Sequence, residues 1–503
     1  MPRVLSAGTF ALAVASAAVL MLAGCASPGH QATPALARGA DTVGLAAGVQ
    51  TTPVDAQWWH QFGDVQLDDL VAKALAGSPN LRMAEARLTR AQAVVDATRG
   101  SEDPQVGFDA SANRQRLSGN GIFPPPYAGK IFNNPDAHFA LSWDADFFGR
   151  QKADLEAAVG NARATQADAD VAAQQIATQV VRAYFSLARL ESQRLVAQRT
   201  LDQRTQMLSL IKQRVSAGID TVVELKQGEG ALPDTRGQIE SLDEQIDLAR
   251  HQLAALTAQP PQSLANLSPT LDQLHVSAQP PVLGADLLAR RPEIAAAIAR
   301  VEAAKQEVLS QRAKFYPDIN FSAAFGLSSL EFNNFADIAS RAWNFGPALS
   351  LPIFEGGQLR AQLKGKAADR DAAIEAYNQQ VIDAVREAAD AATSAASVGR
   401  QQVQEREALD AATSSYQYAQ QRYAQGLGNE LIVLNAETQM LTERRLDVDL
   451  QYRALDVQAQ LMKALGGGWN APADAASSAM PLPAAAASAP TASAARNDNL
   501  TPA

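Results

Sequence analysis

Histidine, cysteine and acidic residues are the side chains best suited to catalysis or metal binding. No two of the five histidines have the spacing of a metal-binding pair: His30, His60, His138, His251 and His275. The sequence contains no G-x-S-x-G nucleophile motif, no P-loop and no glycine-rich dinucleotide fingerprint. Its aspartates and glutamates fall mostly on the faces of predicted helices, where they are solvated charges. We therefore predict that the protein is not an enzyme and has no catalytic residues, metal ligands or cofactor.

The only cysteine, Cys25, ends an apolar amino-terminal segment. Arg3 precedes this segment, and the small residues Ala23 and Gly24 stand directly before the cysteine. This pattern is typical of a lipoprotein signal peptide, here 1–24, whose removal leaves Cys25 as an acylated first residue. The alternative is an uncleaved membrane anchor with an incidental thiol. A single cysteine cannot form a disulfide bond within the chain.

Composition excludes two further classes of protein. The 503 residues carry a formal net charge of −10 without a basic cluster, which argues against a nucleic-acid partner. No apolar run after the signal segment approaches the length of a transmembrane helix. We expect 25–57 to be a spacer and 469–503 to be a disordered tail, because it is rich in Ala, Pro and Ser.

The rest of the chain contains one pattern twice. Pro79 corresponds to Pro292 at an offset of 213 residues (292 − 79), and the same offset relates the residues that follow. Further along, Arg214 corresponds to Arg422 at an offset of 208 (422 − 214). Two halves, 58–257 and 286–468, are therefore predicted to be one structural unit used twice, joined by a proline-rich connector at 258–285.

Each half is predicted to run from a helix through two strands into a long helix, a turn and a returning helix. The strands are expected at about 104–114, 137–147, 317–327 and 343–353, and the coiled coils at 150–257 and 358–465. In the first long helix, apolar residues alternate by four and three from Leu155 to Val215, and only Gln166, Arg194 and Arg204 interrupt them. A period of 3.5 residues predicts a left-handed coiled coil. A helix of roughly 100 Å, at about 1.5 Å per residue, must project from the rest of the molecule.

The strands have the pattern of a membrane barrel. In the third strand, Ile319, Phe321 and Phe325 share one face, and small or polar residues occupy the other. Four strands cannot close, and open edges are not tolerated in lipid, so the barrel must be shared between chains. Eight strands from two chains would be filled by side chains, whereas three chains supply enough for a passage. Aromatic residues that resemble an interfacial girdle cluster near the strand ends: Trp143, Phe147, Phe148, Trp343, Phe345 and Phe354. A soluble sandwich is the alternative, but it lacks a second sheet.

Two segments, 348–360 (ALSLPIFEGGQLR) and 287–294 (LLARRPEI), together with the duplicated Arg-x-x-x-Gly motif, resemble the TolC-like outer-membrane efflux family. The segment before Cys25 and the Trp58-Trp59 pair are most similar to its NodT-type lipoprotein branch, the outer-membrane component of resistance-nodulation-division efflux systems. The resemblance covers about 58–468. It implies an α+β membrane protein: a homotrimer with a twelve-stranded β-barrel, four strands per chain, continued by an α-helical coiled-coil barrel. The residue after the cysteine is Ala26 rather than aspartate, which by resemblance to bacterial sorting rules favours the outer membrane of a Gram-negative bacterium. A large part of the protein would then lie in the periplasm.

The resemblance also implies partners and a function. A periplasmic adaptor and an inner-membrane pump of the resistance-nodulation-division class would deliver drugs and other toxic compounds to the channel for multidrug efflux. The adaptor would contact the two helical tips at Arg214, Gly218, Arg422 and Gly426. Two alternatives are the duct of a type I protein secretion system and a purely structural coiled-coil lipoprotein.

In this family, inward-facing residues just after the second tip glycine close the periplasmic end, typically as an apolar ring followed by an acidic ring. The corresponding positions here are Leu431 and Asn435. Their spacing of four residues places them on one helix face. Asn435 departs from the family pattern, because many relatives carry aspartate there. The alternative roles are a coiled-coil position for Leu431 and simple solvation for Asn435.

Overall fold

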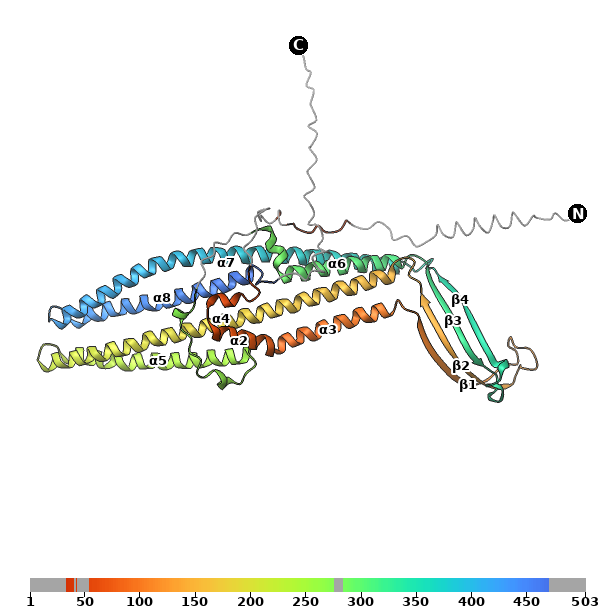
Figure 1. Cartoon of the computed structure of the whole chain (residues 1–503), viewed down its shortest axis with the longest axis horizontal. Helices are drawn as coiled ribbons and strands as arrows, with labels where there is room; N and C mark the ends of the chain where they lie inside the picture. Colours follow the sequence, from red (N-terminus) through yellow and green to blue (C-terminus); the bar gives the residue numbers. More distant parts are fainter. Residues whose placement is uncertain (1–32, 40–41, 43–53, 276–283, 470–503) are drawn as a thin grey trace, which may run out of the picture.

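The computed structural model describes residues 33–39, 42, 54–275 and 284–469. The signal segment, Cys25 and nearly all of the predicted tail lie outside these ranges. The described chain is elongated, with four strands at one end and the tips of two helical hairpins at the other (Figure 1).

The two halves of the chain have matching elements. The first half contains α3 (Pro79–Gly100), β1 (Gln105–Arg116), β2 (Ile131–Asp144), α4 (Arg150–Ser216) and α5 (Val222–Leu256). The second half contains α6 (Pro292–Ala313), β3 (Asp318–Ser328), β4 (Arg341–Ser350), α7 (Gln358–Ala424) and α8 (Glu430–Ala464). Corresponding helices have equal lengths of 22, 67 and 35 residues in both halves, which confirms the internal repeat.

Local sequence signals set the helix ends. Pro79 and Pro292 occupy the first turns of α3 and α6, where a missing N–H costs nothing. A capping box begins α5: the Thr221 hydroxyl accepts a hydrogen bond from the Val223 N–H, and the Glu224 carboxylate accepts one from the Thr221 N–H. These caps satisfy backbone donors that would otherwise lack partners at the helix start.

The four strands form one antiparallel sheet in the order β1-β2-β3-β4. Register places the large apolar residues opposite one another: Phe139 pairs with both Phe108 and Phe325, and Trp143 pairs with Phe321. Small and polar residues occupy the other face, as in the pairing of Ala140 with Gly107 and Ala324. In β3 and β4 the only charged residues are the first ones, Asp318 and Arg341. The sheet therefore has one continuous apolar face, most of which is exposed in the single chain.

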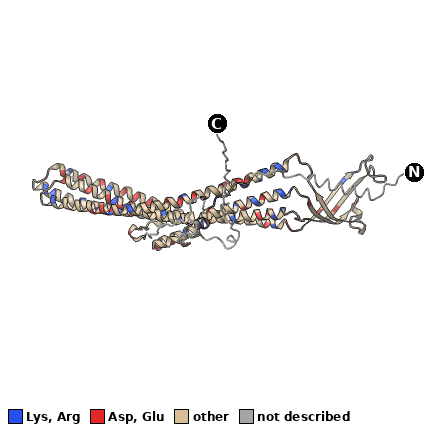
Figure 2. Cartoon of the chain, turned by 90° about the horizontal axis from the view of Figure 1, so that it is seen from above, with Lys and Arg blue, Asp and Glu red and all other residues tan. Residues whose placement is uncertain are grey.

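The long helices are lined by shorter ones. Helices α3 and α5 both pack along α4, while α6 and α8 pack along α7. Charged side chains occur along the whole helical part (Figure 2). Among the helices of the described ranges, none combines the length and apolarity of a membrane crossing.

The structure corrects the predicted packing of the first third of α4. Leu155, Val159 and Ala162 are only half-buried there. The buried positions instead form a second four-three series of small residues that faces α6: Ala153, Ala157, Gly160, Ala164 and Ala167. A Cβ atom on Gly160 would lie only 3.0 Å from the Cβ of Ala303 in α6. The face of α4 that packs against α6 consists of small side chains because these allow the two helix backbones to approach closely.

The largest hydrophobic cluster lies midway along the molecule, where the short helix α2 (Val65–Gly77) packs against α4. Phe62 contacts Phe185 with ring centroids 4.8 Å apart. Nearby, the Tyr184 hydroxyl donates a hydrogen bond to the Asp64 carboxylate at 2.6 Å. This cluster joins the amino-terminal elements to both repeats.

The contact between α4 and α6 can be tested with two glycine substitutions. Gly160→Val should destabilise the protein by about 1–3 kcal/mol, because the added methyl groups meet the backbone of Ala303. Gly237→Ala is the matched control: no described residue outside its own helical turn lies within 4 Å of the new methyl group, and removing a helical glycine should stabilise by about 0.5–1 kcal/mol. Thermal unfolding of the detergent-purified protein measures both effects. Equal melting temperatures for the two variants would contradict the close packing.

Candidate functional site

The two helical hairpins end in turns of the same geometry. Gly218 and Gly426 have positive φ angles of +73° and +77°, which favour glycine. In both turns a backbone N–H after the glycine closes onto the arginine carbonyl: Ile219 onto Arg214 at 2.9 Å, and Leu427 onto Arg422 at 2.8 Å. Apart from the adjoining residues, no atom of the described residues lies within 4 Å of a Cβ placed on either glycine, so their role here is the turn itself.

Arg214 links the two hairpin tips. Its guanidinium group binds the Asp220 carboxylate through two hydrogen bonds of 2.8 and 3.0 Å, and it donates a third to the Tyr423 carbonyl of α7 at 2.9 Å. The guanidinium carbon also lies 4.3 Å from the centre of the Tyr423 ring. The Tyr423 hydroxyl completes the network by donating to Asp220. Hydrogen bonding to Arg214 lowers the pKa of Asp220, so this carboxylate stays ionised.

Arg422 occupies the same position of the repeat but has different surroundings. It is exposed, and the one side-chain hydrogen bond described for it reaches the Leu427 carbonyl at 3.4 Å. The acid that binds Arg214 is missing here, because Asp220 corresponds to Gly428 (220 + 208) in the second half. The two arginines are therefore not equivalent: Arg214 holds the tips together, whereas Arg422 is available at the surface.

Leu431 and Asn435 lie on one exposed face of α8, one turn apart. The Leu431 side chain is 59% exposed, so it does not occupy a coiled-coil position within the chain. The buried positions of this stretch are Val433, Glu437 and Met440. Leu431 is thus an apolar side chain that points away from its own hairpin.

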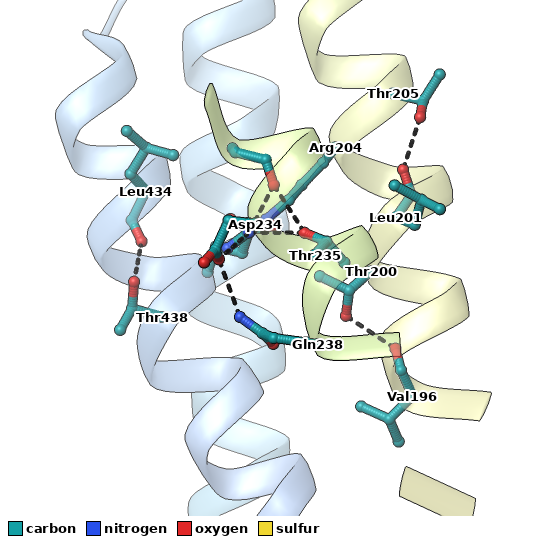
Figure 3. Close-up of polar contacts among 12 residues, drawn as sticks. Val196, Thr200, Leu201, Arg204, Thr205, Asp234, Thr235, Gln238, Leu434 and Thr438 are labelled. Carbon is teal, nitrogen blue, oxygen red and sulfur yellow. Dashed lines mark hydrogen bonds and ion pairs between the residues drawn. The ribbon is translucent and has the colours of Figure 1, made fainter. Parts of the chain in front are cut away.

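Arg204 interrupts the predicted apolar stripe of α4 and binds both neighbouring helices. Its guanidinium group donates to the Thr235 hydroxyl of α5 at 2.9 Å and lies 3.7 Å from Asp234 (Figure 3). It also donates to the Glu437 carboxylate of α8 at 3.3 Å. Arg194, a second interruption, pairs with Asp243 of α5 at 3.3 Å. The two arginines that interrupt the sequence pattern therefore mark ion pairs between helices, whereas Gln166 bonds Asp170 within α4.

Glu430 is a site residue that the sequence analysis does not include. It is the first residue of α8 and is only 2% exposed, and neither carboxylate oxygen has a hydrogen-bond partner among the described residues. One sequence signal is available: the first half has Val222 at this position (430 − 208). Asp220 and Tyr423 were also missed, because their contact joins residues about 200 positions apart.

The predicted girdle aromatics are exposed and lie in and around the sheet. Trp143 stacks on Phe321 near the helical end of the sheet, with ring centroids 5.8 Å apart. Trp343 and Phe345 stack on each other toward the opposite end of β4. Phe147, Phe148 and Phe354 follow the strands, in the turns that lead into α4 and α7.

The described part of the chain contains no cluster of three or more His, Cys, Asp or Glu side chains that could hold a metal ion. Arg214, Asp220 and Tyr423 form contacts between helices instead. This arrangement holds the two hairpins together at their tips.

Comparison with known proteins identifies the family. The family profile described as "Outer membrane efflux protein" matches residues 70–259 and 283–467. The chain is 36% identical over 366 residues to the fusaric acid resistance protein FusA of Burkholderia cepacia, covering 71% of this chain and 69% of that protein. It is 30% identical over 466 residues to the multidrug resistance outer membrane protein MdtP of Escherichia coli K12, covering 90% and 95% of the two chains.

Solved structures agree with these relatives. The outer membrane protein VceC of Vibrio cholerae superposes with a TM-score of 0.78 at 30% identity, covering 83% of this chain and all of that one. The outer-membrane channel OprN has a TM-score of 0.79 at 27% identity, covering 88% of this chain and 100% of that one. The fold class predicted from the sequence is confirmed: a trimeric outer-membrane channel in which each chain supplies four strands of the β-barrel and a helical extension. Because the family consists of channels, the protein is not an enzyme, and it belongs to the outer membrane efflux protein family.

Proposed function

We propose that this protein is the outer-membrane duct of a tripartite efflux system, which passes drugs and other toxic small molecules from an inner-membrane pump and a periplasmic adaptor to the exterior. The observation that carries the proposal is the separation of the two ends of the chain: the apolar sheet at one end and the paired hairpin tips at the other (Figure 1). Helices α4 and α7, with 67 residues each, are roughly 100 Å long at about 1.5 Å per residue. This reach suits a duct that runs from the outer membrane toward a partner in the periplasm.

The sheet supports a closed trimer. β1 and β4 are its outer strands, and each has an edge that no described strand covers. β1 of one chain can complete the edge of β4 in the next, so that three chains with four strands each close a ring of twelve. A barrel of this size leaves an interior passage, whereas eight strands would be filled by side chains.

The tips supply a surface for the adaptor. Each tip glycine is followed by an exposed apolar residue at the same position of the repeat: Ile219 is 62% exposed and Leu427 is 64% exposed. Exposed apolar side chains at the end of a projecting hairpin suit a protein contact. Arg214 and Gly218 shape the first tip, and Arg422 with Gly426 shapes the second. Small-molecule substrates are supported by relatives whose names refer to multidrug and fusaric acid resistance. A pump of the resistance-nodulation-division class is the partner that the sequence resemblance implies.

Leu431 and Asn435 are proposed to close the periplasmic end. In a trimer, the exposed face of α8 can present one Leu431 from each chain to the pore axis, followed one turn later by Asn435. Asparagine can hydrogen-bond across the pore, but it lacks the three negative charges that an aspartate ring would provide. The closed end should therefore show a weak preference for cations.

The tip contact can be tested by placing charge on it. Ile219→Asp together with Leu427→Asp should reduce drug resistance to the level of a strain without the gene, because a carboxylate would have to be buried against the adaptor. The trimer should still form, since both side chains are exposed in the chain. The control, Ile219→Val with Leu427→Ile, keeps the surface apolar and should retain resistance. Full resistance in the aspartate variant would place the adaptor contact elsewhere.

The closing residues can be tested in single-channel recordings. Leu431→Ala with Asn435→Ala should raise the resting conductance and the sensitivity of cells to vancomycin, because smaller side chains widen the ring. Asn435→Asp alone should increase cation selectivity, because a trimer would gain three negative charges. If recordings detect neither change, the constriction lies at other residues.

We also propose that Cys25 carries a lipid that assists assembly and anchors the amino terminus in the outer membrane. The inserted barrel already holds the protein there, so Cys25→Ser with a non-lipoprotein signal peptide should still give trimers, in reduced amount. Quantitative immunoblotting of outer-membrane fractions measures the yield. Complete loss of the trimer would show that the lipid is essential rather than auxiliary.

A further inference from the structure

Glu430 lies at the contact between the two hairpins. It begins α8, and it faces a small cavity of about 20 Å³ that α4, α5, α7 and α8 all line. Its Oε1 would be 3.9 Å from a Cβ atom on Gly228 of α5, and that Cβ would lie 3.0 Å from the side chain of Ile211 in α4. The absence of a side chain at Gly228 therefore makes room for Ile211 and Leu208 of α4, and the Glu430 carboxyl group from the other hairpin lies beside this close contact.

No cation compensates Glu430 among the described residues. Arg214 is bound to Asp220, and Arg204 is bound to Glu437. The remaining polar groups that face Glu430 are Tyr416 and Tyr423 of α7 and two carboxylates of the first hairpin, Asp220 and Glu224. The Tyr423 hydroxyl already donates to Asp220.

An ionised carboxylate is unfavourable in such a place, because it has lost its water and gained no hydrogen bond. Burial raises the pKa of Glu430 to about 7, and the negative charges of Glu224 and Asp220 add to the shift. The packed tips therefore favour the protonated form of Glu430.

We propose that Glu430 is a proton-sensitive latch between the hairpins: the tips pack together with this carboxyl group protonated, and they separate more readily when it is ionised. The inference rests on the proposed function, in which the tips form the closing end of a channel. The repeat itself does not require an acid at this position, because the first half has a valine there, Val222, and this side chain is exposed.

The direction of the pH effect follows from proton linkage. When the hairpins separate, water reaches the carboxylate and its pKa returns toward the ordinary value of 4.5. A pKa of about 7 in the packed state is raised, so protonation stabilises packing fully below about pH 4.5, and this stabilisation is lost as pH rises to about 7. The difference of about 2.5 pH units (7 − 4.5) corresponds to roughly a 300-fold change in the packing equilibrium of one chain.

Planar-bilayer recordings of the purified protein between pH 4.5 and 8 test the latch. In the wild type, the open fraction should rise with pH and level off above about pH 7. Glu430→Gln keeps the shape of the side chain but cannot ionise, so its open fraction should stay at the low wild-type value of acidic pH. The control Glu407→Gln removes the same charge from an exposed position of α7 and should retain the wild-type profile. A wild-type profile that persists in Glu430→Gln overturns the proposal.

Spin labels on the tips provide a measurement that does not depend on conductance. Cysteines replace the exposed Ile219 and Leu427 in a Cys25→Ser background, and double electron–electron resonance measures the distance between the labels. The distance distribution should broaden between pH 5 and pH 8, and Glu430→Gln should prevent this change. A distribution that is independent of pH rejects the latch. If the distances do not depend on pH but the wild type confers resistance and conducts normally, the latch is wrong and the proposed channel function stands. If the wild type shows no conductance at any pH, the proposed channel function is rejected as well.

Discussion

Backbone hydrogen bonding at the edges of the sheet constrains the rest of the molecule. Within the described residues, β1 and β4 each leave one row of N–H and C=O groups without a partner strand. Hydrocarbon offers no water to satisfy such groups, so a strand from another copy must do so. The same sheet has an apolar face built by pairs such as Phe139 with Phe325. Completing the edges in a ring turns every such face toward lipid, and the helices that follow the strands then continue the ring as a second barrel.

The duplicated architecture provides the scaffold, while differences between the copies provide the candidate site. Both tips share the arginine and the glycine, and both turns close in the same way. Only the first tip has Asp220, so Arg214 is held at 8% exposure while Arg422 is exposed. Only the second hairpin has an acid as the first residue of its returning helix: Glu430 begins α8, whereas Val222 begins α5. Asp220 and Glu430, which have no acidic counterpart in the other repeat, therefore both lie where the two hairpins meet.

Buried polar residues between the hairpins favour one arrangement of the helices over others. Arg204 can bind Glu437 and Thr235 together only when α4, α5 and α8 are in the observed register. Such an ion pair adds little net stability, but the loss of one partner would leave a buried charge. Apolar contacts alone would tolerate sliding along a coiled coil. Together, Arg204 and the Arg214–Asp220 pair make the packed state of the tips specific.

The sequence alone determined the features that depend on neighbouring residues. Pro79, Pro292 and the Thr221–Glu224 capping box mark helix starts, and the alternation around Phe321 predicts a strand with one apolar face, because these signals act over a few residues. The repeat offset predicted matching halves, and resemblance led to the efflux family. Only the tertiary structure decided that Gly160 packs against Ala303, that Arg214 and Arg422 have different partners and that Glu430 is buried. The partners involved come from segments far apart in the chain, and no local period encodes the distance between two helices. Burial and charge compensation are set by that distance, so they emerge only when the hairpins are packed together.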